Sequence, residues 1–288
     1  MALWSARDEG NLMGDGFEAR RGDGRTVQYY DTGEGSGPAA TVFWHHGTPQ
    51  TGRLLEPVVE AAARRGIRVV SCARPGYEGT SPLPGRRVVD AAADVLAVAD
   101  ALGIERFASV GASGGGPHAL ACAALAPGRV SAVATLAGIA PYTDDFDWFA
   151  GMASEGALRA ARQGRAERTR YAETAEFDES SFIGADWSAL EGAWGSLGAD
   201  AGRAGSAAPD GEIGDDLAYA TPWGFDLADL DVPVLLVQGG LDRVVPEAHA
   251  QWMLTRLPDA ELWLRPRDGH VSVLAALPVA LDWLLTRV

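Results

Sequence analysis

The chain has 288 residues and a formal net charge of −15 at pH 7. A surface this acidic repels nucleic acid and anionic membranes, so we expect neither as a partner. All 24 basic residues are arginines, which excludes a Schiff-base lysine, a Walker lysine and a Ser-Lys dyad. With 47% hydrophobic and 22% charged residues, the composition is that of a folded globular protein.

The cysteines and the first residues bear on the cellular compartment. Only Cys72 and Cys122 occur, each inside an apolar run, so we expect structural thiols and no disulfide framework. Residues 1–20 mix charges with glycines and lack the apolar core of a signal peptide, and no apolar run reaches membrane-spanning length. We therefore expect a cytoplasmic protein.

The first half of the chain alternates short apolar runs with longer helical patterns. This alternation is typical of βαβ units and predicts a mainly parallel sheet with helices on both faces. A Gly22-Asp23-Gly24 turn predicts a hairpin of residues 17–20 and 26–32. Further strands are expected at residues 40–45, 68–72, 107–112 and 130–137, and helices at residues 54–65, 88–102 and 117–126.

The composition changes between residues 139 and 230, where apolar strand patterns disappear and aromatic residues accumulate. We expect a helical cap here, inserted between core halves at residues 1–138 and 231–288. The stretch 198–214, rich in Gly, Ala, Ser and Asp, is expected to be a mobile loop. The alternation then resumes, with strands at residues 234–239 and 261–265, a helix at residues 247–257 and a last helix ending at residue 288.

Gly111-Ala112-Ser113-Gly114-Gly115 fits the pattern G-x-S-x-G and lies between a predicted strand and a predicted helix. In a nucleophile elbow the serine occupies a strained strand-to-helix turn that exposes its hydroxyl, so small residues must flank it. With 36 glycines in the chain, the motif alone can arise by chance. The strand before it, the helix after it and two partners downstream make Ser113 the predicted nucleophile.

The two partners of Ser113 are expected in loops at the same edge of the sheet. His270 follows the last predicted strand, which makes it the candidate base. Asp242 follows the strand at residues 234–239 and is the candidate carboxylate that orients the imidazole. Asp268 is the rival carboxylate, but it lies only two residues from His270 and is poorly placed to orient the ring. The order Ser, Asp, His is typical of one class of triad enzymes.

Two backbone amides are candidates for an oxyanion hole. The turn at residues 46–49 follows the strand at residues 40–45, and the N–H of Thr48 can face a developing oxyanion there. The N–H of Gly114 lies at the start of the helix after Ser113, where the helix dipole also favours negative charge. His45 and His46 are expected to support this turn. The alternative is a simple strand-ending turn.

These residues, together with Arg74-Pro75-Gly76-Tyr77-Glu78-Gly79-Thr80-Ser81, resemble the α/β-hydrolase superfamily over nearly the whole chain. The resemblance implies an α/β-hydrolase fold: a mostly parallel eight-stranded sheet with helices on both faces and a cap inserted after the sixth strand. It also implies the nucleophile, acid and base roles assigned above, and no cofactor; we expect no metal. Members that resemble haloalkane dehalogenases or epoxide hydrolases carry aspartate in place of Ser113, so their chemistry is not expected.

We expect a serine hydrolase that cleaves a carboxylic ester, thioester or lactone of a small hydrophobic molecule through an acyl-enzyme. Trp148, Phe149, Trp187 and Trp223 are candidates for an apolar substrate pocket, with packing of the cap against the core as the alternative. A peptidase or amidase would use the same triad. A small-molecule receptor, or a cofactor-free cyclase or decarboxylase, would use the pocket with little hydrolysis. The oligomeric state is not predicted.

Overall fold

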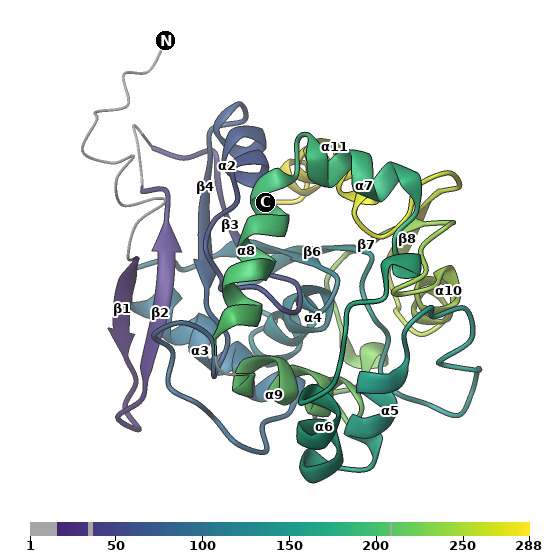
Figure 1. Ribbon diagram of the computed structural model, residues 1–288. Coiled ribbons are helices and arrows are strands. Elements are labelled where there is room, and N and C mark those ends of the chain that lie inside the picture. The colour runs from purple at the N-terminus through teal and green to yellow at the C-terminus, as the bar shows by residue number, and fades with distance from the viewer. Residues whose placement is uncertain (1–15, 34–36, 208) are drawn as a thin grey trace.

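A twisted sheet forms the centre of the molecule in the computed structural model, which describes residues 16–33, 37–207 and 209–288 (Figure 1). Within these residues the sheet has eight strands in the order β1-β2-β4-β3-β5-β6-β7-β8. The strands are β1 (Phe17–Arg20), β2 (Thr26–Asp31), β3 (Ala40–His45), β4 (Ile67–Cys72), β5 (Phe107–Ala112), β6 (Val130–Leu136), β7 (Val234–Gly239) and β8 (Ala260–Arg265). The β1–β2 hairpin is antiparallel and all other neighbours except β2–β4 are parallel, which confirms the expected α/β-hydrolase fold.

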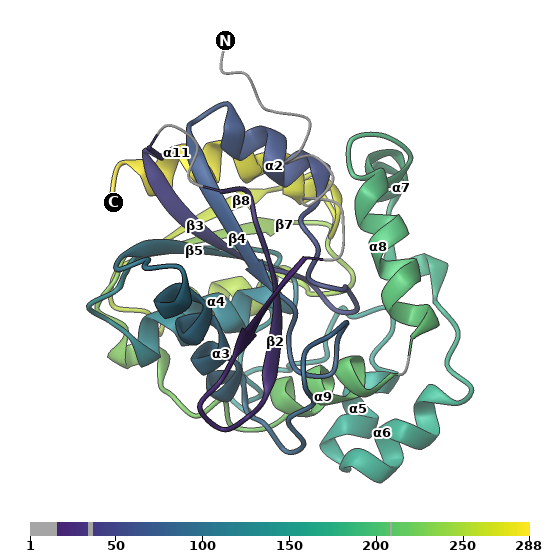
Figure 2. The same ribbon diagram turned by 90° about the vertical axis from the view of Figure 1, so that its left-hand side faces the viewer.

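Helices cover both faces of the sheet. One face packs against α3 (Val88–Ala101), α4 (Gly115–Leu125) and α10 (Glu247–Leu254), and the other against α2 (Glu56–Ala63) and α11 (Leu277–Leu285), which follows the 3-10 helix η3 (Ser272–Ala276) (Figures 1 and 2). Every residue of β4, β5 and β7 is buried, because both faces of these strands are covered. Along β3 the side chains alternate, with Phe43 in one core and Val42 and Trp44 in the other.

The segment between β6 and β7 is called the insertion here (residues 139–230). Figure 2 shows its helices along one side of the sheet. Its elements are α5 (Gly156–Arg162), α6 (Arg165–Ala172), η1 (Glu179–Ser181), α7 (Gly184–Glu191), α8 (Gly195–Ser206), α9 (Asp210–Tyr219) and η2 (Leu227–Asp229). None of the helices described here is long and apolar enough to cross a membrane.

The prediction of a mobile loop at residues 198–214 is wrong, because α8 and α9 occupy most of that stretch. Tertiary contacts outweigh the poor helix propensity of its glycines. Asp200 and Ala204 of α8 are buried, and so is Ile213 of α9. Asp200 accepts hydrogen bonds from the backbone N–H and the hydroxyl of Thr51, at 2.9 and 2.5 Å. Thr51 belongs to the loop after β3, so this contact joins α8 to the carboxyl edge of the sheet.

Buried aspartates connect the insertion to that edge at three points. They lie on three different helices and each has 0% of its surface exposed: Asp186 on α7, Asp200 on α8 and Asp215 on α9. Each one bonds to a different loop at the carboxyl ends of the strands, namely the loops after β8, β3 and β4. Because buried carboxylates need hydrogen-bond partners, these contacts determine how the insertion sits on the sheet.

Candidate active site

Ser113 lies in the sharp turn between β5 and α4. Its φ of 52° is in the left-handed region, which is strained for a residue with a side chain. The Ser113 N–H donates to the Leu136 carbonyl at 2.8 Å, which ties the turn to β6. A side chain on Gly115 would collide with the carbonyl of His45, so only glycine allows α4 to start this close to β3. The serine hydroxyl is therefore presented at the carboxyl edge of the sheet.

The structure brings together the three side chains that the sequence predicts as nucleophile, base and acid. Ser113 Oγ lies 2.9 Å from Nε2 of His270. Nδ1 of the same ring lies 2.8 Å from Oδ2 of Asp242. The three residues come from the loops after β5, β8 and β7. When a hydroxyl, an imidazole and a carboxylate are hydrogen-bonded in this order, the imidazole can take the hydroxyl proton while the hydroxyl oxygen attacks an electrophile.

Asp242 is held in place by its own hydrogen bonds. The backbone N–H groups of Val244 and Val245 donate to its Oδ1 at 2.8 and 2.9 Å. The side-chain amide of Gln238 donates to Oδ2 at 3.2 Å, beside the imidazole. The rival carboxylate, Asp268, instead pairs with Arg265, three residues before it on the same β8 turn. The carboxylate that meets His270 is thus the one from the loop after β7.

Asp186 of the insertion holds the loop that carries His270. Its Oδ1 accepts from the N–H of Val271 at 2.9 Å, and from the N–H and hydroxyl of Ser272 at 2.7 and 2.8 Å. The N–H of Gly269 donates to the Ser272 hydroxyl at 2.7 Å. The backbone on both sides of the histidine is therefore fixed by one buried carboxylate. Sequence reasoning did not identify Asp186, because its partners in the His270 loop are more than eighty residues away.

Two opposing effects act on the His270 imidazole. Burial by itself would lower the pKa of His270, because a charged ring loses solvation there. The neighbouring Asp242 carboxylate outweighs burial through its charge and its hydrogen bond, and the charge of Asp186 adds to it. The pKa of His270 is consequently raised above its ordinary value.

The predicted oxyanion turn lies beside the serine. A Cβ placed on Gly47 would be 3.6 Å from Cβ of Ser113, and one on Gly114 would be 2.6 Å from Thr48 Oγ1. The Gly47 N–H is taken by the side chain of Gln50 at 2.5 Å. In the part of the chain that the structure describes, the N–H groups of Thr48 and Gly114 donate to no protein acceptor. Both amides thus remain available to a bound oxyanion.

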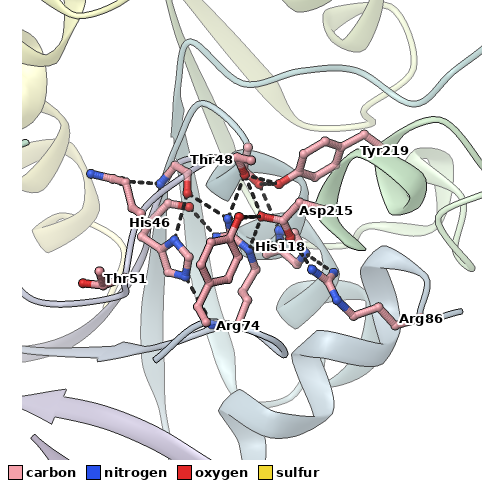
Figure 3. A network of polar contacts seen from close by, with 12 residues as sticks. His46, Thr48, Thr51, Arg74, Arg86, His118, Asp215 and Tyr219 are labelled. Atoms are coloured by element: carbon pink, nitrogen blue, oxygen red, sulfur yellow. Dashed lines mark hydrogen bonds and ion pairs between the residues drawn. The ribbon is translucent and has the colours of Figure 1, made fainter. Parts of the chain in front are cut away.

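A buried ion pair lies directly behind this turn (Figure 3). Asp215 of α9 is bonded to two arginines, Arg74 at 2.5 Å and Arg86. It also accepts from the hydroxyls of Tyr77 and Thr48, at 3.0 and 2.7 Å. Burial works against a charged carboxylate, but the two guanidinium groups outweigh it and hold the pKa of Asp215 well below its ordinary value.

Arg74 connects this ion pair to the backbone of the turn at residues 46–49. Its guanidinium donates to the carbonyls of His46 and Gly47, the latter at 2.8 Å, and to the Thr48 hydroxyl at 2.9 Å. Nε2 of His46 accepts from the Arg74 N–H at 3.2 Å, so its Nδ1 carries the proton and donates to the Gly47 carbonyl at 2.8 Å. Arg74 belongs to the motif that carried the family resemblance, but the sequence did not indicate this contact.

The four aromatic residues proposed for a substrate pocket lie in different surroundings. Trp148 and Trp223 are buried in the hydrophobic core on the face of the sheet that α3, α4 and α10 cover, each with 2% exposure. Phe149 is half-buried, with the Arg159 guanidinium 4.0 Å above its ring. Trp187 is half-buried in a small cluster with two phenylalanines of the insertion. The Trp148 indole N–H also donates to the Ala140 carbonyl at 3.0 Å. The role of the four residues in a pocket stays a prediction.

Across residues 16–33, 37–207 and 209–288, no group of three or more His, Cys, Asp or Glu side chains is arranged to hold a metal ion. Cys72 and Cys122 are both free and buried, and burial raises the pKa of both thiols.

Comparisons with known proteins give a family and several relatives. Residues 40–276 match the family model described as alpha/beta hydrolase fold. A non-heme haloperoxidase of Rhodococcus erythropolis is 27% identical over 257 residues, which cover 86% of this chain and 90% of that protein. A pimeloyl-[acyl-carrier protein] methyl ester esterase of Aromatoleum aromaticum is 40% identical over 60 residues, but these cover only 21% of this chain and 24% of the esterase.

Solved structures share the fold at lower sequence identity. The enol-lactonase of Burkholderia xenovorans LB400 superposes with a TM-score of 0.72 at 20% identity, covering 94% of this chain and 100% of that one. An esterase of Exiguobacterium antarcticum gives a TM-score of 0.68 at 19% identity, covering 94% and 99%. Identities this low show a common fold only.

Proposed function

Because the chain belongs to the α/β-hydrolase fold family, we propose that it is a serine hydrolase that cleaves a carboxylic ester, thioester or lactone of a small hydrophobic molecule. One observation carries this proposal: the continuous hydrogen-bonded series of Ser113, His270 and Asp242 at the carboxyl edge of the sheet. The relatives named as an esterase and an enol-lactonase support an ester or lactone carbonyl as the site of attack.

The proposed reaction proceeds through an acyl-enzyme. Ser113 Oγ attacks the carbonyl carbon while His270 Nε2 takes its proton, and Asp242 stabilises the imidazolium that forms. The amides of Thr48 and Gly114 donate to the oxyanion of the tetrahedral intermediate. The intermediate collapses, and His270 returns the proton to the departing alcohol or thiol. Water, deprotonated by His270, then attacks the acyl carbon, and His270 returns this proton to Ser113 Oγ as the acid is released.

Active-site labelling tests this function directly. We expect a fluorophosphonate probe to label the folded wild-type protein, and p-nitrophenyl esters of different chain length to be hydrolysed at different rates. Matched p-nitroanilides should react much more slowly; faster turnover of the anilides would identify an amidase instead. Folded protein that is neither labelled nor active on any ester would rule out the serine hydrolase and favour a non-hydrolytic role.

The pH dependence tests the role of His270 as base. A base must be neutral to accept the serine proton, so kcat/KM should fall as the pH drops through the pKa of His270. Because that pKa is raised, the midpoint of the fall is expected above the ordinary histidine value of about 6.5. Asp186→Asn removes one of the charges that raise this pKa and should move the midpoint to lower pH. Profiles of kcat/KM for both proteins measure this; an unchanged midpoint would contradict the influence of Asp186.

A further inference from the structure

We propose that helix α9 of the insertion positions the oxyanion hole, through Asp215 and Tyr219. These residues lie four apart, on the same face of the helix. Asp215 bonds to Thr48 and Tyr219 bonds to Gly114, the two residues whose amides would receive the oxyanion. The inference rests on the proposed function, and it assigns to the insertion a part in catalysis that is separate from binding the substrate.

Asp215 controls the Thr48 side of the hole. Its carboxylate accepts a hydrogen bond from the Thr48 hydroxyl at 2.7 Å, and it forms an ion pair with the guanidinium of Arg74. Arg74 in turn holds the carbonyls of His46 and Gly47, and the Gly47 carbonyl belongs to the same peptide group as the Thr48 N–H. The orientation of that amide therefore depends on an ion pair whose acidic partner comes from the insertion. Figure 3 shows Asp215, Thr48, Arg74 and His46 together in this network.

Tyr219 joins the two sides. Its hydroxyl donates to the Gly114 carbonyl at 2.9 Å and lies 2.9 Å from the Thr48 hydroxyl. His118 supports the same carbonyl, since its Nδ1 lies 2.9 Å away. Thr48 follows β3 and Gly114 follows β5, so no short stretch of backbone links them. The Tyr219 hydroxyl is thus a direct contact between the two loops that form the hole.

The space around Gly114 is adapted to this contact. A side chain at that position would collide with the hydroxyl of Tyr219 and come within 2.6 Å of the Thr48 hydroxyl. The absent side chain thereby lets a group from the insertion reach the elbow. An error of about 1 Å in the placement of catalytic groups can lower the rate about 100-fold. Loss of the Tyr219 hydroxyl is therefore expected to lower kcat.

A purely structural role for α9 would have a different signature. Loosening the attachment of the insertion would lower the melting temperature and raise KM, with little change in kcat. Misplacing the oxyanion amides would lower kcat and weaken the binding of a tetrahedral analogue, while the ground-state complex would keep its affinity. The ratio of affinities for a boronic acid and for the product carboxylic acid separates the two roles.

Tyr219→Phe removes the bridging hydroxyl and keeps the ring. We expect kcat on a p-nitrophenyl ester to fall about 10-fold at unchanged KM, and boronic acid affinity to fall by a similar factor. Tyr171→Phe, on the neighbouring helix α6 and outside the network, is the matched control and should leave both values unchanged. Equal kcat and boronic acid affinity in Tyr219→Phe and wild type would overturn the proposal for Tyr219.

Asp215→Asn tests the ion pair, with Asp216→Asn as its control. Asp216 is the next residue on α9, is also buried, and bonds to Arg168 at 2.6 Å, away from the oxyanion turn. We expect about a 100-fold loss of kcat for Asp215→Asn and less than a 3-fold loss for Asp216→Asn, with melting temperatures measured for both. Equal losses of kcat in the two variants would show a general structural role and overturn the assignment.

Labelling of the wild type separates this proposal from the proposed function. If a fluorophosphonate labels the wild type but Tyr219→Phe reacts at the same rate, the positioning role fails and the serine hydrolase stands. If the folded wild type is neither labelled nor active on any ester, the serine hydrolase itself fails, and the positioning role with it. Slower labelling of Tyr219→Phe than of Tyr171→Phe supports both.

Discussion

Replacing Ser113 by alanine is expected to lower kcat on an activated ester by about 10⁶-fold, because no other group takes over the attack on the carbonyl. The fold should persist, since the change removes one oxygen from a half-buried position whose main-chain hydrogen bond to Leu136 remains. Alanine also keeps the left-handed backbone strain of the serine. Steady-state kinetics with a p-nitrophenyl ester, together with fluorophosphonate labelling, measure the effect.

Ser131→Ala provides a matched control. This serine stands near the start of β6, at the opposite edge of the sheet, and its hydroxyl makes one long contact of 3.4 Å to the Phe107 carbonyl. Its removal should change neither kcat nor labelling. Near-wild-type turnover in Ser113→Ala would contradict the assignment of Ser113 as the nucleophile, whatever the control shows.

Asp242→Asn is expected to lower kcat by about 10⁴-fold with little loss of stability. The asparagine amide can still accept the N–H bonds of Val244 and Val245, so the loop keeps its form. It cannot stabilise the imidazolium, and an NH₂ group turned toward His270 Nδ1 selects the wrong tautomer of the ring. The midpoint of the acid limb should also fall, since the main cause of the raised pKa of His270 is gone.

Asp268→Asn separates the two candidate carboxylates. Asp268 pairs with Arg265 on the turn after β8, and its substitution should change kcat by no more than a few-fold. Kinetics of the two variants side by side give the comparison. A large loss in Asp268→Asn with a small loss in Asp242→Asn would reverse the assignment of the acid.

The elements of the core could be predicted closely because their patterns are strong. The expected strands at residues 107–112 and 234–239 coincide with β5 and β7, and every residue of both strands is buried. The helix expected at residues 117–126 begins two residues earlier, because Gly115 and Gly116 continue the turn of the elbow directly into α4. Glycine is a weak helix former, so its presence argued for a later start.

The low helix propensity of glycine also explains why the prediction of a mobile loop at residues 198–214 was wrong. Gly198, Gly202 and Gly205 suggested a flexible stretch, yet they lie within α8. What stabilises this helix is the burial of Asp200 against Thr51 and of Ala204 in the core, and neither contact has a local signal. Helix propensity determines whether a segment forms a helix only where tertiary packing does not.

The sequence by itself determined the alternation of strands and helices and the loops that carry Ser113, Asp242 and His270. It could do so because parallel strands bring their carboxyl ends to one edge, so loops far apart in the chain converge there. Only the tertiary structure decided how the insertion reaches that edge. Asp186 and Asp215 are ordinary acidic residues in their own helices, and their partners are defined by which surfaces pack together in three dimensions.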